Sequence, residues 1–334
     1  MPDDAAAATS RLPTARIGLV TKVARMYHEQ GIRQPEIAAR LSISQSRVSR
    51  LLKEAVNLGV VRTVVVPPPG VHSDLEEAVR TAYGLSDVVV ADALADHEPS
   101  ILNALGAAGA SYLETTLTGR ERLGVSSWSA TLLAVVDAML PRTVHTAESV
   151  VQVLGGVGNA RVQVRAQHLT ERLARVTGAA PMFLPAPGVV ASEAVRDALL
   201  QDEYVAEVVA AWSSLTVLLV GIGSLEPSPL LKDSGNTVSP EEMESLRGSS
   251  AVGDVCLRFY DQDGGLVPSS LNGRVVGISV DELRAVPRKV GVAGGARKYR
   301  AIRAAALGGW IDVLITDVGT AEYLVQAAGM PGRA

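Results

Sequence analysis

Aromatic side chains are scarce in this chain of 334 residues, where Phe, Trp and Tyr together make up 4% against 47% for all hydrophobic residues. The core must therefore consist mostly of Val, Leu, Ala and Ile, a composition that suits buried parallel strands. Charged residues make up 20%, which is ordinary for a folded protein with a large core. The length is too great for one small domain and fits two.

Cysteine is nearly absent. The single Cys256 excludes an intramolecular disulfide, so a reducing, cytoplasmic compartment is expected. It lies between Val255 and Leu257 in a run that predicts a strand. This position favours a buried, inert thiol over a nucleophile.

Targeting and membrane signals are also lacking. The first ten residues, MPDDAAAATS, carry acids where a signal peptide has bases, and no apolar core follows them. Residues 208–225 do form a charge-free run that approaches the length of a membrane span. Because this run contains Ser213, Ser214 and Thr216 and then a glycine-rich turn, the end of a helix followed by a buried strand explains it better.

The motifs of several chemical functions are missing. The five histidines show no metal-ligand spacing, and no G-x-x-x-x-G-K-[ST] loop occurs, so neither a metal site nor nucleotide hydrolysis is supported. The glycine pairs at 156–158 and 221–223 each lack the third glycine of a dinucleotide fingerprint. No nucleophile elbow or Ser/His/Asp set is recognisable. The sequence therefore predicts no metal, no cofactor and no catalytic residue.

The formal net charge of -4 hides an asymmetry between the two parts of the chain. Between Arg11 and Arg62 there are ten Lys or Arg residues against three acids, a balance of +7, whereas residues 63–334 carry -9. A basic head on an acidic body indicates a polyanionic partner for the head alone.

The most informative stretch of that head is 34–58, QPEIAARLSISQSRVSRLLKEAVNL. It predicts two short helices joined by a turn at 42–44, with Ser44 placed to accept the first free amides of the second helix. From Val48 on, apolar residues recur at i, i+3, i+4, i+7 and i+10, which predicts one buried stripe.

The opposite face of the second helix is polar and basic. It carries amide, hydroxyl and guanidinium groups, which bond base edges and phosphates. For this helix alone, an amphipathic surface helix with a solvated face is the alternative; together with the preceding helix and the turn, the pattern favours a helix-turn-helix. The residues predicted to contact double-stranded DNA are Gln34, Gln45, Ser46, Arg47, Ser49, Arg50 and Lys53.

Composition also sets the segment boundaries. Residues 1–12 are expected to be a disordered tail and residues 13–66 the DNA-binding domain, which begins with a helix that Gly31 ends. The β-branched run 60–66 is a candidate strand and the possible wing of a winged domain. Residues 67–72 contain three consecutive prolines and predict a stiff linker, leaving 73–334 as a second domain for effector binding and oligomerisation.

The second domain alternates strands with helices, which predicts an α/β fold with a largely parallel sheet and helices on both faces. The expected strands are 87–91, 122–125, 150–154, 182–185, 216–221, 255–259, 275–280, 289–293 and 313–316. The expected helices are 73–83, 99–118, 130–140, 164–176, 192–200, 240–247, 297–306 and 320–327. Residues 261–265, DQDGG, predict a hairpin or loop tip that interrupts the alternation.

Small and polar residues follow four of these strands, at 124–131, 155–159, 221–224 and 294–298. Ligands of open α/β sheets bind beyond the carboxyl ends of the strands, so these loops form a candidate site. Each loop alone can equally be a tight turn. Hydroxyls and free amides of the first loop could hold a phosphate, and Lys298 in the last could pair with an anion.

If the protein were an enzyme, either of two aspartates could act as its general base. Asp254 heads the 255–259 strand, where it would face the pocket, and Asp317 follows the 313–316 strand. A structural interpretation, a carboxylate that caps a turn or bonds loop amides, is stronger for Asp317 than for Asp254.

The chain resembles the SorC family of bacterial sugar-responsive transcriptional regulators from about residue 16 to 328. The resemblance is carried by EIAARLSISQSRVSRLL at 36–52, VVQVLGGVGN at 150–159, LPAP at 184–187, VGIGSL at 220–225, AVGDVCLRFYDQDG at 251–264, VVGISVDEL at 275–283 and GVAGGARKYRAIRAAALGGWIDVLITD at 291–317. It implies a C-terminal domain similar to ribose-5-phosphate isomerase and glucosamine-6-phosphate deaminase that binds a phosphorylated sugar without turning it over. It also implies a homodimer or homotetramer on palindromic operators.

The resemblance further implies roles for single residues. Ser126, Ser129 and Thr131 would hold the phosphate or hydroxyls, Asp254 would bond sugar hydroxyls, and Lys298 would pair with the phosphate. The floor of the site would be shaped by Gly155, Gly156 and Gly158. One departure is Ser129-Ala130, where the family usually has glycine followed by a basic or polar residue.

The hypothesis from sequence is therefore a DNA-binding regulator of carbohydrate catabolism that is controlled by a sugar or polyol, and this effector is expected to be phosphorylated. The alternative is a sugar-phosphate isomerase or deaminase with a DNA-binding head, which would need a positioned acid–base pair. A purely architectural DNA protein would leave the four loops unexplained. No membrane partner is expected.

Overall fold

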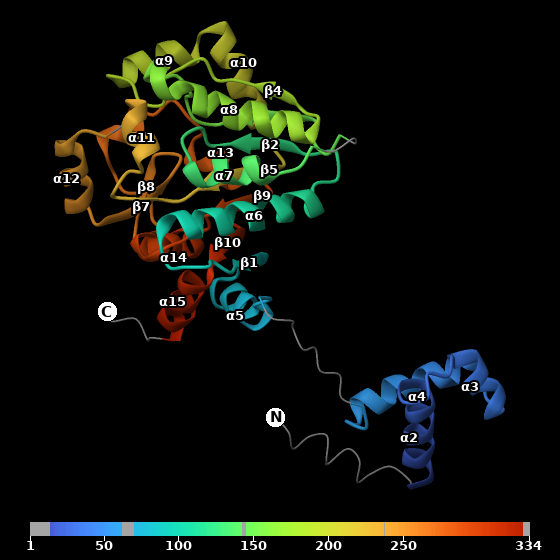
Figure 1. Ribbon diagram of the computed structural model, residues 1–334. Helices are drawn as coiled ribbons and strands as arrows, with labels where there is room; N and C mark the ends of the chain where they lie inside the picture. The colour runs from blue at the N-terminus through green and yellow to red at the C-terminus, as the bar shows by residue number, and fades with distance from the viewer. Residues whose placement is uncertain (1–13, 62–69, 142–144, 237, 330–334) are drawn as a thin grey trace. The chain divides into compact units, whose positions relative to one another are not determined.

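A computed structural model describes residues 14–61, 70–141, 145–236 and 238–329 (Figure 1). The chain divides into two compact units, Met1–Pro68 and Pro69–Ala334. The expected tail at 1–12, most of the candidate wing at 60–66 and the three prolines of the expected linker lie outside the described residues.

Over residues 14–61, the described part of the first unit, the chain forms three helices, α2 (Thr14–His28), α3 (Gln34–Arg40) and α4 (Gln45–Asn57). Their apolar stripes meet in one core, in which Val20, Ile37 and Val48 are fully buried. The predicted stripe of α4 is confirmed. Ser44 caps α4 by accepting from the Arg47 amide at 3.3 Å, as expected, and Ser42 makes the turn with a φ of +54°.

The second unit is built on a seven-stranded sheet in which all neighbouring strands run parallel. In spatial order the strands are β1 (Asp87–Ala91), β10 (Val313–Asp317), β9 (Arg288–Val292), β5 (Val217–Gly221), β2 (Arg122–Val125), β3 (Ser149–Gln152) and β4 (Ala180–Met182). The parallel α/β sheet expected from the alternating pattern is confirmed.

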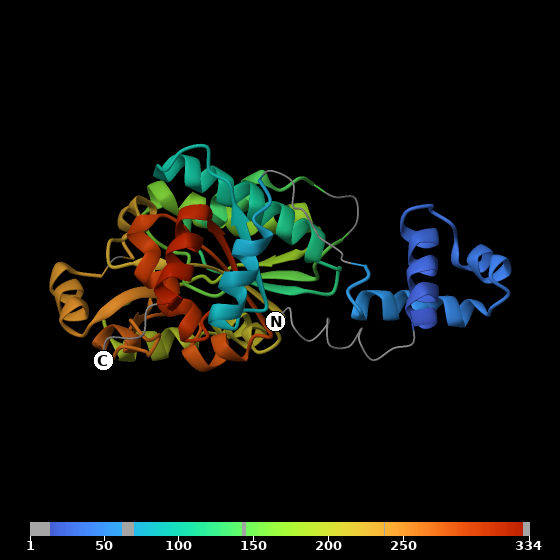
Figure 2. The same cartoon turned by 90° about the horizontal axis from the view of Figure 1, so that it is seen from below.

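Helices cover both faces of this sheet (Figures 1 and 2). Successive strand residues point to opposite faces, so that Val217 and Leu219 enter one core while Leu218 and Val220 enter the other. The first core is completed by α6 (Glu98–Thr116), α7 (Ala130–Ala138) and α8 (Ala160–Thr177). The second is completed by α5 (Ser73–Tyr83), α10 (Glu203–Trp212), α13 (Val280–Ala285), α14 (Tyr299–Leu307) and α15 (Val318–Gly329), and α9 (Glu193–Leu200) packs on α10.

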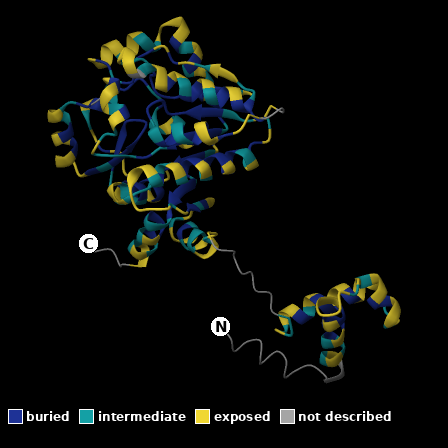
Figure 3. Cartoon of the chain, viewed as in Figure 1, coloured by how far each residue is buried: buried dark blue, intermediate teal, exposed yellow. Residues whose placement is uncertain are grey.

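A small antiparallel sheet lies beside the carboxyl end of β5. It consists of β6 (Gly223–Ser224), β7 (Ala251–Val255) and β8 (Arg258–Asp261), and it carries α11 (Pro229–Ser234) and α12 (Pro240–Gly248). Figure 3 shows the strands buried in the interior and the exposed residues concentrated on the outer helices. Within the described part of the chain, no helix is both long and apolar enough to cross a membrane.

The prediction of a strand at 255–259 is wrong, because residues 256 and 257 form the turn of the β7–β8 hairpin. Cys256 and Leu257 have φ values of +52° and +60° and join the two strands. The Asp254 carboxylate stabilises this turn by accepting from the Leu257 amide at 3.0 Å. Apolar residues at a buried turn give the same pattern as a buried strand, so the periodicity could not distinguish the two.

The strand expected at 275–280 is also wrong. Val275 and Gly277 form only isolated bridges, and α13 already begins at Val280. The buried Arg258 guanidinium donates to the carbonyls of Asn272, Gly277 and Ile278. A side chain from another strand thus satisfies carbonyl groups that a sheet ladder would otherwise bond.

Candidate functional site

The polar face of α4 is accessible. Gln45, Ser46, Ser49, Arg50 and Lys53 are all exposed. Arg47 is exposed as well, and Gln34 is partly exposed at the start of α3. The structure therefore places all seven DNA-contact candidates on or beside the accessible side of the helix pair.

The one acid of α4, Glu54, is held away from this face. Its carboxylate forms two hydrogen bonds with the Arg16 guanidinium of α2, at 2.9 and 3.2 Å. Arg50 is oriented along the helix by a 3.4 Å hydrogen bond from its Nε to the Ser46 carbonyl. The face thus presents cations and neutral polar groups, which favours contact with a polyanion.

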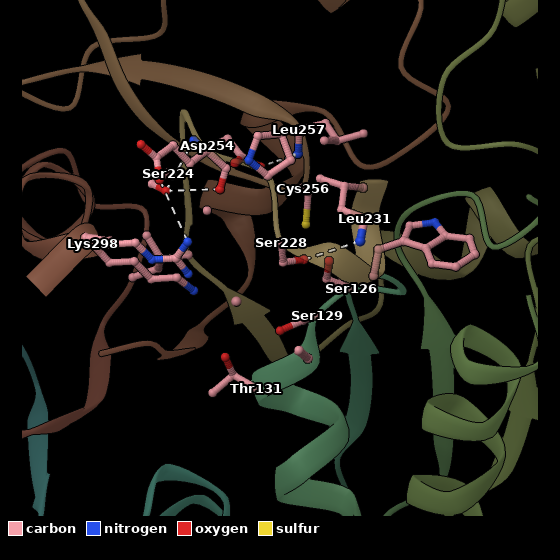
Figure 4. Close-up of a pocket in the computed structure, with 18 of the residues that line it drawn as sticks. Ser126, Ser129, Thr131, Ser224, Ser228, Leu231, Asp254, Cys256, Leu257 and Lys298 are labelled. Carbon is pink, nitrogen blue, oxygen red and sulfur yellow. Dashed lines mark hydrogen bonds and ion pairs between the residues drawn. The ribbon is translucent and has the colours of Figure 1, made fainter. Parts of the chain in front are cut away.

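A cavity of about 120 Å³ opens at the carboxyl ends of β2 and β5, between the parallel sheet and the small antiparallel sheet (Figure 4). Ser126, Ser129, Thr131, Asp254 and Lys298 all line it. These five predicted effector residues come from three widely separated parts of the sequence, and the fold brings them together at one site.

The β2–α7 connection supplies the hydroxyls of the cavity. Ser129 is the N-cap of α7 and accepts from the Leu132 amide at 3.2 Å, and Thr131 lies in the first turn. Gly221 at the end of β5 makes room for this connection, since a Cβ there would lie 2.4 Å from Ser129 Oγ and overlap it. The close approach explains why a glycine ends β5.

Asp254 is the fourth residue of β7, not the head of the following strand as expected. Its side chain is buried against Gly223, where an added Cβ would overlap the carboxylate. Burial raises the pKa of Asp254 to about 6, and the Leu257 hydrogen bond and the Lys298 ammonium oppose this rise. A carboxylate that is partly protonated near neutral pH is costly to bury and typical of functional sites.

Lys298 lines the same end of the cavity as Asp254 (Figure 4). Burial lowers the pKa of its ammonium group, and Asp254 is the main opposing influence. Burial therefore penalises the charge of both groups, and each charge partly offsets the penalty on the other. An anionic or hydroxylated ligand that bonds both would relieve that penalty.

Asp317 positions the loop that carries Lys298. Its carboxylate accepts from the Gly295 amide at 2.8 Å and from the Thr320 amide at 3.0 Å, and Thr320 Oγ1 donates to it at 2.6 Å. Gly295 has a φ of +90°, which a non-glycine residue adopts only with strain. The structural interpretation of Asp317, a carboxylate that bonds loop amides, is confirmed.

The three glycines expected on the floor of the site, Gly155, Gly156 and Gly158, do not line the cavity. A Cβ on Gly155 would overlap the Pro187 carbonyl. The Asn236 side chain, which accepts from the Gly188 amide and donates to the Val157 carbonyl, ties the 155–159 loop to two other segments. These glycines serve close packing, and only Leu154 from this part of the chain reaches the cavity.

Sequence reasoning missed Arg297 as a lining residue. Its guanidinium lies 2.8 Å from Glu98 and 3.8 Å from Glu226, and it borders both this cavity and an adjoining one of about 330 Å³ at the start of α6. The sequence did hold a signal for it, because Arg297 directly precedes Lys298 in the glycine-rich loop 294–298. The partner Glu98 lies 199 residues away and could not be paired from sequence.

Cys256 also lines the cavity, but burial raises the pKa of its thiol to about 12. The thiolate form is therefore absent near neutral pH, in agreement with the expected inert thiol. Across residues 14–61, 70–141, 145–236 and 238–329, no three His, Cys, Asp or Glu side chains are grouped so that they could hold a metal ion.

Comparison with known proteins adds independent information. Residues 68–326 match the family described as "Putative sugar-binding domain". The deoxyribonucleoside regulator of Bacillus subtilis is 31% identical over 308 residues, covering 92% of this chain and 97% of that protein. The sorbitol operon regulator of Klebsiella pneumoniae is 30% identical over 314 residues, covering 93% and 98%.

The fold shows the same relationship. The crystal structure of the full-length sorbitol operon regulator SorC from Klebsiella pneumoniae matches with a TM-score of 0.70 and 29% identity, covering 93% of this chain and 100% of that one. The similarity thus extends over the head and the α/β unit together. These relatives are named as regulators.

Proposed function

This chain belongs to the SorC family of sugar-binding transcriptional regulators, and from this premise we propose that it is a DNA-binding regulator of carbohydrate catabolism whose operator binding responds to a sugar or polyol. The head binds double-stranded operator DNA through α4, and the α/β unit binds the effector. The protein acts in the cytoplasm as a homodimer or homotetramer, because paired helix-turn-helix units on a palindromic operator require two-fold symmetry.

The observation that carries this proposal is the cavity itself. It combines a buried carboxylate, Asp254, with a cation, Lys298, and with the hydroxyls of the β2–α7 connection. Carboxylates and hydroxyls bond the hydroxyl groups of sugars, and an ammonium group pairs with a phosphate. The effector-contact residues we propose are Ser126, Ser129, Thr131, Asp254 and Lys298.

The effector acts through differential affinity. It can shift the equilibrium between DNA-binding and released states only as far as it binds one of them better. Typical couplings of about 1–3 kcal/mol correspond to a 5–150-fold change in DNA affinity.

We expect a panel of sugar phosphates and free polyols, tested by thermal shift, to raise the melting temperature of the α/β unit in the intact protein. A sugar phosphate should stabilise more than the matching free sugar, because Lys298 can pair with the phosphate. Lys298→Gln should reduce the ratio of the affinities for the sugar phosphate and for the free sugar about tenfold or more. Lys232→Gln, at an exposed position of α11, serves as the control. Stabilisation by free polyols alone would show that Lys298 does not bind a phosphate.

A sugar-phosphate isomerase or deaminase is the second candidate, and the raised pKa of Asp254 is the observation that favours it, since general bases are often tuned in this way. We nevertheless expect no sustained turnover of pentose and hexose phosphates, because the relatives are named as regulators. Product formation would be followed by NMR with parent protein and Asp254→Asn. Turnover that Asp254→Asn abolishes would make the protein an enzyme.

A further inference from the structure

The cavity has two chemically different ends. Asp254 and Lys298 lie at one end, Leu231 lies at the other, and Ser126 and Ser129 lie between them (Figure 4). Five other apolar residues that line the cavity share one cluster with Leu231, and the six together are here called the apolar end: Leu154, Leu231, Val238, Met243, Leu257 and Phe259.

The apolar end is a packed surface contributed by several elements. Leu231 comes from α11, Met243 from α12, and Leu257 and Phe259 from the β7–β8 hairpin. All six side chains belong to, or pack against, one apolar cluster. Their geometry is therefore fixed by the fold and does not depend on a single mobile side chain.

The backbone amides and the Trp128 and Ser127 side chains near this end already have partners, and the Ser228 hydroxyl lies between the two ends (Figure 4). The Trp128 indole Nε1 donates to the Gly155 carbonyl at 2.8 Å, and Ser127 Oγ donates to the Leu154 carbonyl at 2.7 Å. The Leu257 amide is used by Asp254, and the Leu231 amide by Ser228 Oγ. None of the six side chains that define the apolar end carries a hydroxyl, amide or charged group.

This distribution conflicts with a ligand that has a hydroxyl on every carbon. A hydroxyl placed against these side chains would lose its water without gaining a partner, which costs about 1–3 kcal/mol. An alkyl or aryl group in the same place would instead gain about 25 cal/mol per Å² of buried apolar surface.

From this contrast, and resting on the proposed function, we infer that the effector is an amphiphilic carbohydrate derivative: a hydroxylated, often anionic head bound by Asp254 and Lys298, joined to an alkyl or aryl substituent in the apolar end. The adjoining cavity of about 330 Å³, which shares Thr131 and Lys298 with this one, leaves room for the head to extend. Free sugars and simple sugar phosphates would fill only the polar part of the site.

The test uses the full-length protein and four sugars, glucose, galactose, xylose and ribose, each as free sugar, available phosphate, and methyl, butyl and phenyl β-glycoside. Affinities are measured by titration calorimetry after a thermal-shift screen. Each buried methylene contributes roughly fourfold in affinity, so for at least one sugar the butyl and phenyl glycosides should bind at least about tenfold tighter than the methyl glycoside.

Leu231→Asn places an amide in the apolar end and should reduce the ratio of phenyl-glycoside to methyl-glycoside affinity to below about threefold. Leu140→Asn, at a residue that is 70% exposed and outside the cavity lining, is the matched control. The alkyl series with the parent protein decides the question even if Leu231→Asn fails to fold.

The outcomes separate the two proposals. If a free sugar or sugar phosphate binds and its alkyl and aryl derivatives bind no tighter, the inference is overturned and the proposed function stands. If no compound of this panel binds, the inference fails, whereas the proposed function is decided separately by the thermal-shift panel of sugar phosphates and free polyols.

Discussion

Asp254→Asn should make the ligand-free protein more stable near neutral pH and at the same time weaken its binding of carbohydrate. Burial raises the pKa of Asp254 to about 6 in the folded protein, against an ordinary value of 3.8 for an aspartate. Between these two values the folded state binds the extra proton, so stability falls as the pH rises through this window. Above pH 6 the full cost is present, about 3 kcal/mol from the shift.

An asparagine removes this cost and keeps an oxygen that can accept from the Leu257 amide. The gain in the free energy of unfolding will be smaller than this full cost, because the substitution also removes the negative charge opposite Lys298. We expect a gain of about 1–2 kcal/mol at pH 7.5 that shrinks toward zero as the pH is lowered to 4. Denaturant unfolding of the intact chain at several pH values measures this. Asp263→Asn, at an exposed position, provides the control.

The same substitution should weaken carbohydrate binding about tenfold or more, because a charge-assisted hydrogen bond is lost. A stability that drops at every pH, or unchanged affinity for a compound that the parent protein binds, would contradict the assignment. Gain of stability with loss of binding is the behaviour of a residue kept for function at the expense of the fold.

The helix-turn-helix could be predicted closely because its signals are local. The buried stripe of α4, the Ser44 cap and the short turn all lie within 25 residues. The parallel sheet was predictable for a similar reason, since each buried strand and each amphipathic helix can be recognised from the hydrophobic pattern of its own residues.

The site was predictable only in part, because its geometry is not local. Glycines follow both β3 and β5, but the sequence does not tell which loop faces the ligand and which one packs against neighbouring backbone. Gly221 faces the cavity, whereas Gly155 packs on Pro187. The turn at Cys256 and Leu257, where both residues have positive φ, could not be predicted because it contains no glycine.

Arg50→Ala should weaken DNA binding by about 5–150-fold, corresponding to the 1–3 kcal/mol of a base-reading arginine, and should relax sequence preference at one position of the half-site. Arg50 is exposed near the middle of the polar face of α4, and Glu54, the acid of this helix, is paired with Arg16. The probe is the tightest duplex that the full-length protein selects from a random pool, titrated by fluorescence anisotropy.

Salt dependence distinguishes reading a base from holding a phosphate. Lys53→Ala should weaken binding to all duplexes alike and lower the slope of log K against log salt concentration by about 1, whereas Arg50→Ala should leave that slope nearly unchanged. Arg25→Ala removes an equal charge from α2, where the guanidinium is paired with Glu29, and should alter neither affinity nor preference. If Arg50→Ala bound the selected duplex as tightly as the parent at several salt concentrations, α4 would not be the recognition helix.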